Sequence, residues 1–70
     1  MDDNTRRDIR RLLKTFGVQA DKAITEHLAR NPDIGALRVR VTLDDLTDYG
    51  ETLPRGSLEL DIEEEIGSAG

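Results

Sequence analysis

The sequence predicts an α+β fold in which two N-terminal helices, joined as an αα-corner, pack on a small antiparallel β-sheet in the order helix, helix, strand, strand. Two observations indicate this class. Apolar residues recur at helical spacing up to residue 28, and from Leu37 onward they alternate with polar residues, as in a half-buried strand. We expect one small α+β domain over residues 1–66 and a frayed tail at residues 67–70.

The first helix is predicted to begin within residues 2–5 and to end at Gly17. Asn4 or Thr5 is expected to cap the free N–H groups of the first turn. One face carries apolar residues at the spacing i, i+3, i+4 and i+7, namely Ile9, Leu12, Leu13 and Phe16. Gly17 is expected to stop the helix, because glycine adopts the left-handed conformation of a helix C-terminus without a Cβ penalty.

A second, shorter helix is expected after Val18. Its apolar stripe is thin and consists of Ala20, Ala23, Ile24 and Leu28. Asn31-Pro32 is expected to close this helix, because a residue that precedes proline disfavours the right-handed helical region. Residues 31–35 then form a turn that leads into the strands.

Two strands are predicted, over residues 37–43 and 58–63, from alternation of apolar and polar residues. If they pair antiparallel, Arg38 and Arg40 face the acids of the second strand on the exposed side. Such cross-strand pairs contribute roughly 0.2–1 kcal/mol each. The strands are expected to pair either within one chain or across the two-fold axis of a dimer.

Residues 44–57, between the strands, form a long segment for a structureless loop in a small domain. We expect Leu46, Tyr49 and Leu53 to lie back on the core, unless part of the segment forms a short edge strand. The expected core draws on both helices and both strands: Ile9, Leu12, Leu13, Phe16, Ile24, Leu28, Val39, Val41, Leu60 and Ile62.

Length and composition narrow the class of protein. Chains below roughly 70–80 residues seldom fold securely without disulfides, a metal or self-association. This chain has 70 residues, no cysteine and one histidine, so of these three stabilising devices self-association as a homodimer remains, although many domains of about 55–65 residues fold alone. The absence of cysteine suits a cytoplasmic location, and no apolar run predicts a membrane span or a signal peptide.

The charge is unevenly distributed. Residues 1–40 carry a net charge of +3 and residues 41–70 a net charge of −8, for a total of −5. The basic residues of the first helix form a possible contact face for an anionic partner, unless they are only a solvated surface. This possible basic contact face consists of Arg6, Arg7, Arg10, Arg11 and Lys14.

We expect no catalytic, cofactor-binding or metal-binding residues. His27 is the only histidine, and no serine has a plausible base beside it in the sequence. Asp44, Asp45 and Asp48 invite a calcium-loop interpretation, but the spacing fails, since Leu46 and Tyr49 fall where a ligand and a glycine are required. The sequence therefore argues against an enzyme.

The run from Ile9 to Val18, read as I-R-x-x-L-K-x-x-G-V, resembles a family of short uncharacterised bacterial proteins described only as a domain of unknown function. The similarity covers residues 5–43 and extends to the last strand. Where those relatives place a Ser or Thr cap after Gly-Val, this chain has Gln19-Ala20. The resemblance implies a bacterial, soluble protein and brings no catalytic residues with it.

Two functions are considered. The first is a non-enzymatic protein-interaction module that self-associates, or docks on another protein, through an edge of its sheet. The alternative is a DNA-binding accessory protein with a reduced winged-helix-like arrangement that uses Arg6, Arg10, Lys22 and Arg30. Nucleic acid is the less favoured partner, because residues 20–30, the expected recognition helix, are close to neutral.

Overall fold

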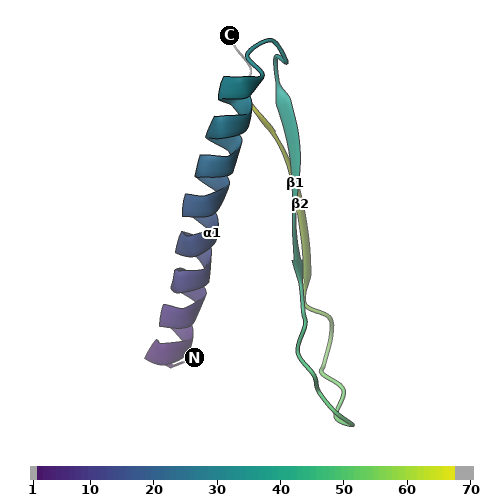
Figure 1. Ribbon diagram of the computed structural model, residues 1–70. Helices are drawn as coiled ribbons and strands as arrows, with labels where there is room; N and C mark the ends of the chain where they lie inside the picture. The colour runs from purple at the N-terminus through teal and green to yellow at the C-terminus, as the bar shows by residue number, and fades with distance from the viewer. Residues whose placement is uncertain (1, 68–70) are drawn as a thin grey trace. The chain divides into compact units, whose positions relative to one another are not determined.

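The computed structural model describes residues 2–67 and contains one helix followed by two antiparallel strands (Figure 1). The helix α1 spans Asp3–Arg30, and the strands β1 and β2 span Leu37–Asp44 and Glu59–Ile66. The chain divides into two compact units, the first ending at Ile34 and the second beginning at Gly35. The α+β class is confirmed, whereas the predicted order of two helices and two strands is wrong.

Helix α1 is continuous through Gly17, where the sequence predicted a corner. Gly17 does not have a positive φ, unlike Gly35, Gly50 and Gly56. A glycine within a helix costs only about 1 kcal/mol relative to alanine, and the hydrogen-bonded turns on both sides outweigh this cost. A second helix would also need a capping residue at its start, which Gln19-Ala20 does not supply.

Side-chain caps define both ends of α1. Asp2 is the N-cap, and its Oδ1 accepts a hydrogen bond of 2.7 Å from the backbone N–H of Thr5. The predicted caps, Asn4 and Thr5, lie within the helix instead. At the other end the backbone N–H and the Nδ2 of Asn31 both donate to the carbonyl oxygen of His27, at 3.1 and 2.9 Å. The predicted helix end at Asn31-Pro32 is therefore confirmed.

The two strands pair antiparallel within one chain, which decides between the two pairings that the sequence left open. Eight consecutive pairs run from Leu37 opposite Ile66 to Asp44 opposite Glu59. Because side chains alternate between faces, one face is largely apolar and the other is charged. The apolar face carries Leu37, Val39, Val41, Leu43, Leu60, Ile62, Glu64 and Ile66; the charged face carries Arg38, Arg40, Thr42, Asp44, Glu59, Asp61, Glu63 and Glu65.

The segment between the strands forms no further strand within residues 45–58. It turns where the N–H of Thr52 donates to the carbonyl oxygen of Tyr49 at 3.1 Å, next to Gly50 with a φ of 62°. Leu46 and Leu53 are 92% and 84% exposed, so the expectation that they lie back on a core is wrong.

The expected core is also wrong, because no residue among 2–67 is buried. Phe16 is 46% exposed, Leu13 is 61% exposed, and Val39 and Val41 are half-buried. One helix and one two-stranded hairpin each have a single apolar face, and such a face becomes a core only against a second layer. Of the predicted frayed tail, only Gly67 lies within the described residues.

Candidate functional site

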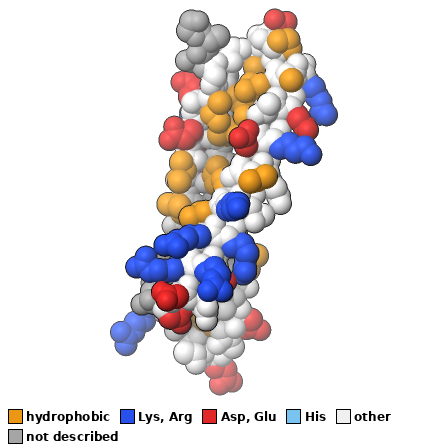
Figure 2. All heavy atoms as spheres, turned by 90° about the vertical axis from the view of Figure 1, so that its left-hand side faces the viewer, with side chains coloured by type: hydrophobic (Ala, Val, Ile, Leu, Met, Phe, Trp, Pro, Cys, Tyr) orange, Lys and Arg blue, Asp and Glu red, His pale blue; other side chains and the backbone are white. Residues whose placement is uncertain are grey.

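All five residues of the possible basic contact face lie on exposed turns of α1 between Arg6 and Lys14. At 3.6 residues per turn they span about 140° of the helix surface. Figure 2 shows blue Lys and Arg side chains gathered toward the lower part of the molecule, where the first turns of α1 lie in Figure 1. Arg11 is held by Asp8 at 2.9 Å, an exposed pair of the kind that contributes little to stability.

The residues proposed for DNA binding do not share a face. On one continuous helix, Lys22 and Arg30 lie about 120° and 160° around the axis from Arg10. The helix–turn–helix that would have presented them is absent from the described part of the chain, since Gly17 lies within α1. The reduced winged-helix arrangement is therefore wrong.

The charged face of the hairpin contains a small ion-pair network around Arg40. Its Nη2 lies 2.6 Å from Oε1 of Glu63, and its Nε lies 3.4 Å from Oδ1 of Asp61. One guanidinium thus connects two acids of β2. For Arg40, this confirms the prediction that arginines of the first strand face acids of the second. Arg38 and Asp44 form no ion pair within residues 2–67, and Asp44 lies opposite another acid, Glu59.

Within residues 2–67, each strand of the hairpin pairs on one side only. The sheet has two strands, so the outward side of β1 and the outward side of β2 each present a row of unpaired backbone N–H and C=O groups. We call these rows the β1 edge and the β2 edge. The eight pairs of the register run without interruption, and neither strand contains proline. Such an edge is a template for pairing with another strand.

The apolar face of the hairpin has one charged member. Leu60 and Ile62 of β2 are 52% and 42% exposed, and Glu64 lies on the same face opposite Val39. The strand predicted from the sequence ended at residue 63 and therefore did not include Glu64. Continuing the period of two past Ile62 would have found it.

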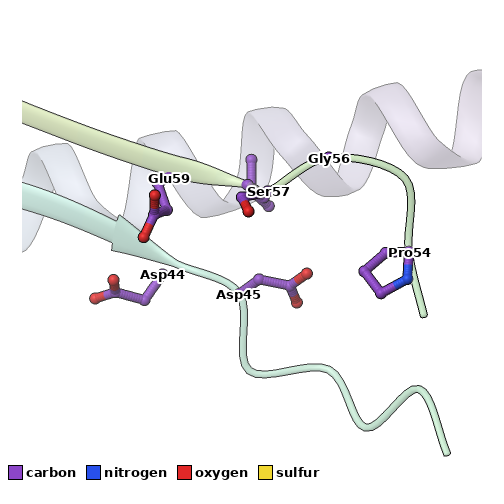
Figure 3. A pocket seen from close by; sticks show the side chains of 7 residues that line it. Asp44, Asp45, Pro54, Gly56, Ser57 and Glu59 are labelled. Atoms are coloured by element: carbon purple, nitrogen blue, oxygen red, sulfur yellow. The ribbon is translucent and has the colours of Figure 1, made fainter. Parts of the chain in front are cut away.

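A shallow hollow of about 250 Å³ lies where the strands meet the connecting segment (Figure 3). Asp44 and Glu59 project from neighbouring strand ends, while Pro54 and Gly56 line the returning arm. The carboxylate of Asp45 is already engaged by the chain itself. Within residues 2–67 no group of His, Cys, Asp and Glu side chains is arranged to hold a metal ion.

Asp45 organises the connecting segment. Its Oδ1 accepts the backbone N–H of Thr47 at 2.9 Å, and its Oδ2 accepts a short hydrogen bond from the hydroxyl of Tyr49. The hydrogen bond from Tyr49, followed by that from Thr47, lowers the pKa of Asp45, and the bond to Asp45 raises the pKa of Tyr49. This pair was not predicted from the sequence, although an Asp two residues before Thr47 is a signal for such a turn. These contacts stabilise the conformation of the connecting segment.

Comparisons with protein-family models, with curated protein sequences and with solved structures found no match to this chain. The class of protein is therefore defined by its own architecture, a long helix followed by an antiparallel hairpin with two open edges. Among the described residues, no helix combines the length and the apolar character needed to cross a membrane.

Proposed function

We propose that this chain is a non-enzymatic protein-interaction module that binds a polypeptide strand along an open edge of its hairpin. The observation that carries the proposal is an uninterrupted register of eight pairs in a sheet of only two strands. In strand addition, main-chain hydrogen bonds supply affinity and alternating side chains supply specificity. The hairpin offers both.

The low stability of a hairpin with only two strands supports this function. An isolated two-stranded hairpin is at best marginally stable in water, and three or more strands with an apolar face are needed for independent stability. Strands of eight residues extend for about 27 Å, long enough to bind an added strand of ordinary length. Addition of a strand therefore stabilises the hairpin at the same time as it binds the partner.

The chemistry of the described residues favours binding over catalysis. The hollow at the strand ends is lined by carboxylates, and one of them, Asp45, is engaged by Thr47 and Tyr49. We place the module in the cytoplasm, because the chain has no cysteine that an oxidising compartment would use.

Amide hydrogen exchange tests the proposal. Every second residue of an antiparallel strand points its N–H away from the neighbouring strand, so the outward amides of a free edge exchange rapidly. Isotope-labelled protein is titrated with two synthetic peptides that have the sequences of β1 and β2. We expect the outward amides of one strand to become protected from exchange as the concentration of the peptide, or of the protein itself, is raised. Unprotected outward amides on both strands under all these conditions would overturn the proposal.

A further inference from the structure

The β1 edge is the edge for which the charges of the hairpin favour one partner. We infer that β1 of a second copy of this chain adds to the β1 edge, so that two hairpins join as a continuous four-stranded antiparallel sheet about a two-fold axis at Val41. This inference rests on the proposed function and names the partner, the edge and the register. The edge lies in the plane of the sheet, so the pairing does not depend on what covers the apolar face.

Charge excludes the β2 edge from pairing with itself. All four charged-face residues of β2 are acidic: Glu59, Asp61, Glu63 and Glu65. Any antiparallel pairing of two β2 strands that keeps their apolar faces on the same side therefore sets acid opposite acid, and like charges directly opposite are destabilising. Charged edges of this kind protect a sheet against unwanted pairing.

The β1 edge is self-complementary. Its charged face carries Arg38 and Arg40 toward one end and Asp44 at the other. When the two-fold axis passes through Val41, Arg38 of each copy lies opposite the Asp44 of its partner. On the apolar face, Val41 then lies opposite itself and Val39 opposite Leu43. Opposite charges therefore face each other on the charged face of this interface, and apolar side chains face each other on the apolar face.

Neighbouring registers are worse. Only a register centred on a residue keeps the apolar faces together, because side chains alternate with a period of two. A centre at Arg40 sets this arginine against its own copy, and a centre at Val39 sets Arg38 against Arg40. A centre at Thr42 needs Arg40 to face Asp44, although Arg40 is already held by two acids of β2.

The two residues that the inferred register joins are not engaged in an ion pair within the hairpin, although Arg38 lies opposite Glu65 in the register. Arg38 and Asp44 form no ion pair among the described residues, and Asp44 lies opposite Glu59, a like-charge pair. A second copy would place Arg38 beside Asp44 and offset that repulsion at both ends of the interface. An isologous contact of this kind also closes after two copies, whereas addition of β1 to the β2 edge would propagate into a filament.

Disulfide trapping tests the register directly, because the chain has no cysteine of its own. In Val41→Cys the two thiols meet at the axis. Opposed residues of antiparallel strands have Cα atoms about 4.5–5.5 Å apart, within the range of a disulfide. The matched control is Ile62→Cys, on the same face and directly opposite Val41. In the four-stranded sheet, the two thiols of this control variant would be three strand spacings apart, or about 14 Å.

We expect the Val41→Cys protein to oxidise largely to a covalent dimer and the Ile62→Cys protein to remain uncrosslinked under the same conditions. Crosslinking of the Ile62→Cys protein, or a mixed disulfide between the two variants, would overturn the inferred edge. Absence of a dimer for both variants would overturn the pairing at Val41.

Charge reversal gives an independent test. Arg38→Asp or Asp44→Arg alone sets like charges opposite each other at both ends of the interface. We expect each variant to dissociate at concentrations at least about tenfold higher than wild type, as measured by sedimentation equilibrium. A mixture of the two variants restores both opposite-charge pairs and should form a heterodimer. The matched controls Arg55→Asp and Glu51→Arg make the same charge changes in the connecting segment and should dimerise as wild type does.

The outcomes separate this inference from the proposed function. Concentration-dependent protection of the outward amides of β2, or a peptide-protected edge in a chain that sediments as a monomer, would overturn the inferred dimer and keep the edge as a binding site. Unprotected outward amides on both strands would overturn both. Failure of the two charge-reversed variants to associate when mixed would overturn the register.

Discussion

The helix and the hairpin satisfy their backbones in different ways. The helix α1 makes its hydrogen bonds within itself and closes its ends with Asp2 and Asn31. In the hairpin, the backbone groups on one side of each strand are hydrogen-bonded to the other strand, and those on the outward side have no strand to pair with among residues 2–67. A helix is complete along its own backbone, whereas a sheet is complete only when its edges are paired or protected. The binding of another backbone that we propose therefore uses the hairpin and not the helix.

The continuity of α1 through Gly17 can be tested by substitution. Gly17→Pro is expected to lower the free energy of unfolding of the helical unit by about 3 kcal/mol, because proline removes a hydrogen bond and clashes with the preceding turn. Circular dichroism during denaturation measures the loss. Asp3→Pro is the matched control, since proline is tolerated at the first helical position. Equal stability of the two variants would show that the helix is interrupted at Gly17.

A smaller change at the same position tests continuity in the opposite direction. Gly17→Ala is expected to stabilise the helical unit by about 1 kcal/mol, because alanine has the higher helix propensity and an added Cβ meets no atom within 4 Å. At a corner with positive φ the same substitution would destabilise. A lower thermal midpoint in the alanine variant would therefore restore the predicted αα-corner.

The stability of the hairpin is expected to depend mainly on side-chain pairs between its two strands. Arg40→Ala is expected to lower the free energy of unfolding of the hairpin by roughly 0.2–1 kcal/mol, because it removes the contacts to Glu63 and Asp61 on an exposed face. Thr42→Ala, on the same face and without an ion pair, is the control. A double-mutant cycle with Glu63→Ala isolates the pair, and a coupling energy of zero would contradict the contact.

The smallest effect is local to the connecting segment. Tyr49 is the only tyrosine and there is no tryptophan, so its ultraviolet absorbance reports one phenol. We expect the phenol to titrate above its ordinary pKa of 10.0 and to return toward that value in Asp45→Asn. A titration unchanged by Asp45→Asn would contradict the hydrogen bond.

The pH window of this bond follows from both partners. The pKa of Asp45 is lowered and the pKa of Tyr49 is raised. The contribution of the carboxylate is present above its ordinary pKa and is lost as the pH falls through the lowered value. The contribution of the phenol is present below its ordinary pKa and is lost as the pH rises through the raised value. Stabilisation of the loop is therefore complete around neutral pH.

The sequence by itself determined the features that depend on neighbours along the chain. The end of the helix at Asn31-Pro32, the two alternating strands and the pairing of arginines with acids all follow from local spacing, because caps, periodicity and proline act within a few residues. The N-cap at Asp2 was missed by two or three residues, since several residues in that run are able to cap a helix.

The tertiary structure decided what depends on competition between distant or nearly equal alternatives. A glycine within a helix costs about 1 kcal/mol relative to alanine, which is too little for Gly17 alone to decide between a corner and a continuous helix. The register decided that Glu64 shares a face with Val41 and that Asp44 lies opposite Glu59. A shift of one residue would have reversed every face. Only the paired strands therefore reveal the open edge and the unpaired charges that the inferred dimer uses.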